Sequence, residues 1–269
     1  MTESGTQRRT SNATRVIIVA VVAALYALAK GVTGSVPTPW GVGQLLIGIF
    51  VPAFFAVVSD TWSVAIGAGL GTFIGDSLFL TGSTNPALSL IAGVPANFLA
   101  FLLFGWFVKR YRSWSAFVAA SISFVTLGNL IAATSITFFG ASVYSNLASL
   151  IPKYYVGGFI LGLTLFWTVT MVPIVLIVVP ILVRAIRPLY GRSSVLSDIP
   201  AWVDARTPGP IVVSVLLAVV LVLIVALYLP GPLGLAGYST SISDISLAIV
   251  GLVIVAPVAG TAVARPGPR

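Results

Sequence analysis

The sequence contains no cysteine and no histidine, and only 7% of its 269 residues are charged. Without cysteine there are no disulfides, thiolate nucleophiles or cysteine metal ligands. Without histidine the commonest general base and metal ligand is missing. We therefore expect no metal site, no cofactor and no enzymatic activity. The acidic residues number six, namely Glu3, Asp60, Asp76, Asp198, Asp204 and Asp244.

Hydrophobic residues, in contrast, make up 58% of the chain. Soluble domains carry about 25% charged residues, so a surface this poor in charge would not stay dissolved. Several apolar runs approach the roughly 20 residues that a helix needs to cross a bilayer. The runs are continuous rather than alternating, which favours helices over strands. The sequence thus predicts an all-α integral membrane protein.

Eight membrane spans are expected, six forming a core and two following it near the C-terminus. Pro173 and Pro180 predict a kink or tilt in the sixth span. The spans are Val16–Lys30, Val42–Val58, Trp62–Leu80, Ala87–Val108, Ser115–Phe139, Tyr154–Val183, Ile211–Leu229 and Ile245–Ala264.

The basic residues give these spans an orientation. We expect the chain in the plasma membrane. With the N-terminus in the cytoplasm, twelve of the fourteen Lys and Arg residues fall on the cytoplasmic side, as the positive-inside rule requires. Only Lys30 and Lys153 fall outside. Both termini are therefore expected in the cytoplasm, and the net charge of +8 reflects orientation in lipid rather than binding to nucleic acid.

The chain divides into four parts. Residues 1–14 are a polar leader, expected to be disordered, and residues 15–187 form the six-helix transmembrane core. A Pro- and Gly-containing cytoplasmic linker covers residues 188–210. Residues 211–269 hold two additional transmembrane helices and a short tail. These two helices are apolar on every face, which is typical of contact with lipid.

Asp76 is the first candidate for a functional role, because a carboxylate within a bilayer is costly and usually faces a cavity or a partner. An interfacial carboxylate wetted by outside water is the plainer alternative. Other polar residues lie at similar depth, where helix–helix hydrogen bonding is again the plainer reading. Together they suggest a substrate pocket that opens outward, lined by Asp76, Asn97, Asn129, Gln44 and the loop residue Trp40.

Small residues recur at helical spacing in two places. Gly67, Gly71 and Gly75 repeat every four residues, a pattern typical of close helix packing. A second stripe lies in the first span, facing either another helix of this chain or a partner protein. It consists of Ala20, Ala23, Ala24 and Ala27.

These features together resemble the substrate-binding S component of energy-coupling factor (ECF) transporters. The matching segments are Ala20-Val-Val-Ala-Ala24, the Gly- and Pro-rich loop 31–43, Gly75-Asp76 and Gly93-Val-Pro-Ala-Asn97. The resemblance covers about residues 15–190. It implies a six-helix core that binds a vitamin or related micronutrient from outside. The alanine motif would meet the transmembrane T subunit of the transporter, and the two C-terminal spans depart from the pattern.

The resemblance also implies that ATP hydrolysis belongs to two separate ATPase subunits, and the sequence holds no Gly-x-x-x-x-Gly-Lys-Ser/Thr loop. A stand-alone secondary transporter that carries a proton on Asp76 is the main alternative. An intramembrane aspartyl protease would need a second aspartate at depth, whereas Asp60 falls in a turn and Asp244 near the outer surface. A structural or assembly protein is a further alternative.

Overall fold

The computed structural model describes residues 11–34, 38, 42–79, 84–143, 156–189, 195, 196 and 202. Within these ranges the chain is nearly all helical and contains no strands. The C-terminal pair of spans, most of the linker and most of the polar leader lie outside the described residues. The helices are α1 (Asn12–Thr33), α2 (Phe50–Val58), α3 (Thr61–Leu78), α4 (Pro86–Leu88), α5 (Val94–Tyr111), α6 (Trp114–Phe139) and α8 (Val156–Ala185).

Short non-α turns join some of these helices. A 3-10 turn, Ile47–Ile49, leads into α2, and a π-helical turn, Ser89–Gly93, joins α4 to α5 without a break. The last turns, Gly140–Ser142 and Arg187–Leu189, follow α6 and α8. Helix α1 begins at Asn12, capped by Ser11, so that the end of the expected disordered leader is in fact helical.

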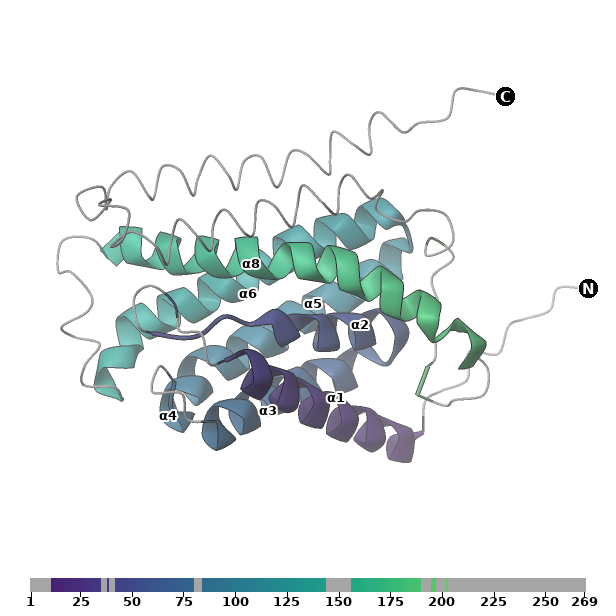
Figure 1. The fold of residues 1–269 in the computed structure, drawn as a ribbon, viewed down its shortest axis with the longest axis horizontal. Helices are drawn as coiled ribbons and strands as arrows, with labels where there is room; N and C mark the ends of the chain where they lie inside the picture. Colours follow the sequence, from purple (N-terminus) through teal and green to yellow (C-terminus); the bar gives the residue numbers. More distant parts are fainter. Residues whose placement is uncertain are drawn as a thin grey trace, which may run out of the picture.

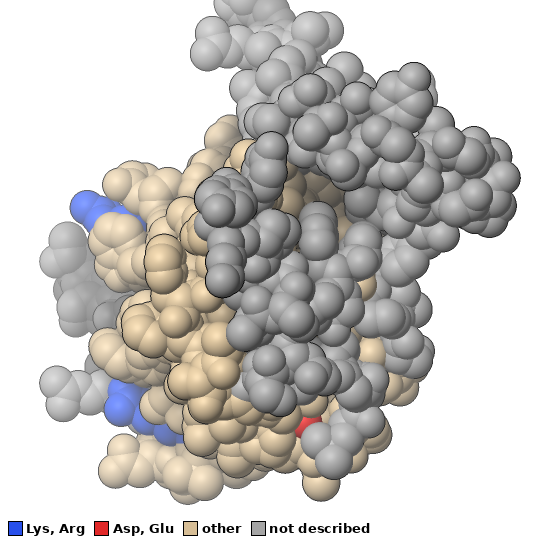
Figure 2. Space-filling model, turned by 90° about the vertical axis from the view of Figure 1, so that its left-hand side faces the viewer, with Lys and Arg blue, Asp and Glu red and all other residues tan. Residues whose placement is uncertain are grey.

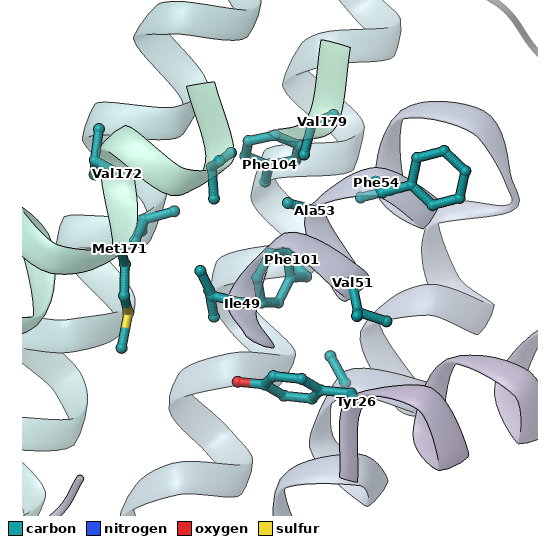
Figure 3. Close-up of a cluster of buried hydrophobic side chains, with 14 of the residues drawn as sticks. Tyr26, Ile49, Val51, Ala53, Phe54, Phe101, Phe104, Met171, Val172 and Val179 are labelled. Carbon is teal, nitrogen blue, oxygen red and sulfur yellow. The ribbon is translucent and has the colours of Figure 1, made fainter. Parts of the chain in front are cut away.

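The long helices form an arc around α2. In the order α1, α3, α5, α6, α8 each packs on the next, while α2 lies inside the arc against α1, α3, α5 and α8 (Figure 1). Every residue of α2 after Phe50 is buried, as expected for a helix that is apolar on all sides. Figure 3 shows side chains of this central segment between those of α5 and α8, including Ile49, Ala53, Phe101, Phe104, Met171 and Val179.

Four helices of the described part are long and apolar enough to cross a membrane: α1, the continuous segment from α4 to α5, α6 with its last turn, and α8. Helix α3 is less apolar because of its glycines and Asp76. Figure 1 shows α8 bending along its C-terminal half, which contains Pro173 and Pro180. In the face that Figure 2 shows, uncharged residues dominate and charged residues occupy a few spots.

The second expected span, Val42–Val58, is wrong as a continuous helix. Only Ile47–Val58 is helical, about 18 Å at 1.5 Å per residue. Residues 42–46 instead run as irregular backbone, of which residues 42–45 are buried. The backbone leaves the helical region at Leu46, with φ −118° and ψ 70°, and again at Gly43, whose φ of 72° is left-handed, so the helix does not extend backwards.

A close helix contact joins α1 to α3 along the three glycines. A Cβ atom on Gly67 would lie 2.8 Å from Val22 Cβ, and one on Gly71 would lie 2.8 Å from the carbonyl oxygen of Ala23. Gly75 similarly faces Ala27 and Lys30. The contacts advance together along both helices, so α1 and α3 are parallel. The glycine stripe is thus confirmed as a packing surface.

One end of the bundle gathers basic residues, and we call it the basic end. Here Lys109 at the end of α5 donates to the carbonyl of Ser59, and the Ser59 hydroxyl donates to the carbonyl of Val195 at 2.7 Å. Trp202 stacks on Phe117 at a ring distance of 4.8 Å. The start of α1 and the end of α8 lie at the same end (Figure 1). Of the seven described basic residues, only Lys30 lies away from it.

Replacing Gly71 by Ala should destabilise the fold, because the new methyl group would press on the backbone of α1. Overpacking of this kind costs about 1–3 kcal/mol. The matched control is Gly69→Ala on the same helix, whose Cβ would meet only Val94 and Phe98 at 3.5 Å or more. That control should be neutral or gain up to about 1 kcal/mol from helix propensity. Melting temperatures in detergent test this, and equal values for the two variants would contradict the close contact.

Asp60 should make the stability depend on pH. It caps α3, accepting from the Ser63 amide at 3.0 Å and the Ser63 hydroxyl at 2.7 Å. Burial alone raises the pKa of Asp60, but the bonds from Ser63 and the charges of Arg15 and Lys109 outweigh it and lower the pKa. A group whose pKa is lower in the folded chain stabilises above its unfolded value, about 4, and loses this effect as the pH falls.

Asp60→Asn keeps a good N-cap but cannot titrate. The wild-type melting temperature should therefore fall more steeply than that of the variant below about pH 4. The measurement is a series of thermal unfolding curves from neutral to acidic pH. Parallel profiles for the two proteins would show that Asp60 does not carry the effect.

Candidate functional site

A cavity of about 70 Å³ lies between the helices, and side chains from all parts of the arc line it. Four of the five side chains that the sequence singles out for a pocket are on its wall: Gln44, Asp76, Asn97 and Asn129. Trp40 lies outside the described residues. The sequence placed these four in separate spans, and the arc of helices brings them to one space.

Asp76 is paired with Lys30 across the α1–α3 contact. The Lys30 Nζ atom lies 2.7 Å from Asp76 Oδ1, and the two side chains are only 4% and 5% exposed. The expected first span ends at Lys30, and this pairing with Asp76 was not among the expectations from the sequence. Helix α1 continues to Thr33, and the close approach at Gly75 brings the lysine beside the carboxylate. The opposite charge makes burial of each group tolerable.

The irregular segment 42–46 forms another part of the wall. Its carbonyl groups are hydrogen-bonded, because Trp167 Nε1 donates to the carbonyl of Gln44 at 3.0 Å and Thr38 donates to those of Val42 and Gly43 at 2.6 and 3.0 Å. A Cβ on Gly43 would lie 2.5 Å from the Trp167 ring. Non-helical backbone is stable in an apolar interior only with such partners.

The π-helical turn Ser89–Gly93 shapes the opposite wall. The amide of Val94 donates to the carbonyl of Ser89, five residues back. Pro95 follows, and it has no N–H to donate to the carbonyl four residues earlier, so the wider turn relieves the local conflict. Asn97 then faces the cavity one turn on. Its Nδ2 donates to the carbonyl of Gly93 at 2.9 Å.

The other polar groups on the wall differ in how fully they are bonded. The Tyr26 hydroxyl donates to Asn97 Oδ1 at 3.3 Å, and Asn129 Nδ2 donates to Thr168 Oγ1 at 3.2 Å. Figure 3 shows the Tyr26 hydroxyl directed toward the region between Ile49 and Met171. By contrast, the buried hydroxyls of Ser89 and Thr84 have no hydrogen-bond partner among the described residues.

Several wall residues were missed by sequence reasoning. Lys30 had a usable signal, since it shares a helical face with Ala23 and Ala27, the residues that meet the glycines. Trp167 and Ser89 had none, because one is an aromatic residue in a continuous apolar run and the other is a common helix residue. Their roles depend on the irregular segment and the π turn, which apolar periodicity does not reveal.

The alanine stripe of α1 does not form a single free face. Ala23 and Ala27 are buried against the glycines of α3, at 5% and 3% exposure, whereas Ala20 and Ala24 are exposed. Ala23 and Ala27 therefore face another helix of this chain, which is one of the two alternatives that the sequence left open. The reason is that the glycine face of α3 requires small residues opposite it.

The described residues that line the cavity carry no net charge, and some of them are polar. Its one ionic element, Lys30 with Asp76, is internally balanced, and most of the remaining wall is apolar. Among the described residues there is no cluster of acidic side chains that could hold a metal ion. The wall offers amides, hydroxyls and an aromatic surface at Trp167, groups of the kind that orient a small molecule in a binding pocket.

Comparisons of the chain with protein-family models, curated proteins and solved structures found no match.

The Lys30–Asp76 pair should behave as a unit in mutagenesis. Removing either partner alone, as Lys30→Met or Asp76→Asn, leaves an uncompensated buried charge and should cost about 3–5 kcal/mol. The double variant removes both charges and should recover most of this loss. The measurement is a double-mutant cycle of unfolding free energies in detergent. Single-variant effects that simply add in the double variant would contradict the ion pair.

Proposed function

We propose that the chain is a multi-pass membrane protein and the substrate-binding subunit of an ECF-type importer. It captures a small micronutrient from outside in the cavity and delivers it inward together with a T subunit and two ATPase subunits. Both termini lie in the cytoplasm, and the basic end faces the same side. The protein itself performs no chemical conversion of the substrate.

The observation that carries this proposal is the cavity lined by Gln44, Asp76, Asn97 and Asn129 inside a bundle of apolar helices. A mostly apolar cavity with a few polar groups, set between apolar helices, is what a membrane-embedded binding protein needs. The basic residues support the orientation, because six of the seven described ones lie at the basic end and lysine and arginine favour the cytoplasmic side.

Docking to the T subunit is assigned to the exposed alanines of α1, Ala20 and Ala24, with the neighbouring exposed residues Leu28 and Val16. Small side chains let a second helix approach closely in lipid. Ala23 and Ala27 contribute only indirectly, by holding α1 on α3.

A proton-coupled transporter that works alone is the second candidate from the sequence. The ion pair weighs against Asp76 as a simple proton carrier, because protonating the carboxylate would leave the Lys30 charge buried without a partner. The two mechanisms differ in their energy source. Uptake into vesicles should require ATP and the partner subunits in the first case, and only a proton gradient in the second.

Native mass spectrometry of the purified chain should reveal a retained small molecule. Ala132 lines the cavity on α6, so Ala132→Phe should fill the space and abolish the adduct. The matched control is Ala119→Phe, at an exposed position on the same helix, which should keep it. Loss of the adduct in both variants, or its persistence in both, would place the molecule elsewhere and remove the cavity as the binding site.

A further inference from the structure

We propose that the cavity selects an uncharged ligand whose amide-like group is bound by the Ser89 and Thr84 hydroxyls. The inference rests on the proposed function, because it names the chemistry of the substrate held at that site.

The first step concerns charge. Asp76 already has a cationic partner 2.7 Å away, supplied by Lys30 from the same chain. A cationic ligand bound beside the pair would also face the Lys30 amine, and an anionic ligand would also face the Asp76 carboxylate. Either ion would bring an uncompensated charge into a site whose own charges already balance, which is unfavourable. A neutral ligand avoids this cost.

The second step concerns the unused polar groups. Thr72 on the cavity wall donates to the carbonyl of Ala68 at 2.8 Å, the usual bond of a helical hydroxyl to the residue four before it. Ser89, at the start of the π turn, makes no such bond and is only 3% exposed. A buried hydroxyl without a partner is unfavourable, and a ligand can satisfy it.

The third step concerns what those hydroxyls can recognise. A hydroxyl both donates and accepts, and Ser89 and Thr84 line the same cavity. The donors of Asn97, Asn129 and Trp167 already bond to groups of the protein. A carboxamide, lactam or similar group offers both an acceptor and a donor without net charge. Its apolar body would lie against residues such as Ile49, Ile136 and Met171.

The fourth step concerns size. A water molecule needs about 10–15 Å³ of such space, so the cavity of about 70 Å³ holds roughly five to seven water-sized groups. The ligand, or the part of it held here, is therefore small and compact.

Three isosteric probes test the charge selection on the purified full-length chain: isobutyramide, isobutyramidine and isobutyrate. They share one shape but are neutral, cationic and anionic. Dissociation constants are measured by saturation-transfer NMR titration. The neutral amide should bind at least about tenfold more tightly than either ion. Tighter or equal binding of an ion would overturn the charge assignment, and no binding by any probe would overturn both the size and the chemistry.

Two variants test the hydroxyl contact. Ser89→Ala should weaken isobutyramide binding by about fivefold, the effect of one hydrogen bond. The control is Thr126→Val, which removes another buried hydroxyl without a partner, at a residue that is not among those lining the cavity. It should leave the dissociation constant unchanged. Equal effects of the two variants, or none from Ser89→Ala, would remove Ser89 as a ligand contact.

A third variant, Lys30→Met, tests whether the ion pair controls which charge the cavity accepts. Lys30→Met leaves the Asp76 carboxylate without its amine, so isobutyramidine should bind this variant more tightly than the wild type and raise its melting temperature. Absence of rescue in a folded variant would show that the ion pair does not control charge selection. A charged molecule found in native mass spectrometry would overturn this inference while leaving the carrier function in place. If the chain binds the neutral probe selectively but supports no uptake, the inference about the ligand stands and the carrier function is overturned.

Discussion

The approach of α1 to α3 is the constraint on which the rest of the structure depends. Gly67, Gly71 and Gly75, one helical turn apart, let the two helices come so close that a methyl group added to any of them would press on α1. This contact sets the relative height of the two parallel helices. As a result the lysine near the end of one helix meets the aspartate near the end of the other. The cavity then forms beside that pair, where the irregular segment and the π turn widen the space between α3, α5, α6 and α8.

Much of the helical arrangement could be predicted from the sequence, because long apolar runs have few alternatives to helix. The positions of α1, α3, α6 and α8 follow the expected spans within a few residues. The gathering of Gln44, Asp76, Asn97 and Asn129 also follows from their similar depth. The number of spans that cross a membrane stays a prediction.

The parts that could not be predicted are those where the backbone leaves the α-helix. Val42–Leu46 is apolar enough to read as helix, but Gly43 and Leu46 both leave the helical conformation before the 3-10 turn that follows. The only signal for the π turn is Pro95. A proline within an apolar run predicts that the helix is interrupted there, but not whether the result is a kink, a break or a π turn. The pairing of Lys30 was missed because the lysine, at the end of the expected first span, was counted with the outer basic residues and not as a partner for Asp76.

The parallel contact between α1 and α3 also dictates an order of assembly. Parallel neighbours cannot be joined by a tight hairpin, so the chain must form α2 and return before α3 reaches α1. Until then Lys30 has no carboxylate beside it, since Asp76 is made 46 residues later. The first helix therefore gains the partner of its lysine only when the third helix docks. A nascent chain that stops before Asp76 would leave the Lys30 charge without its carboxylate.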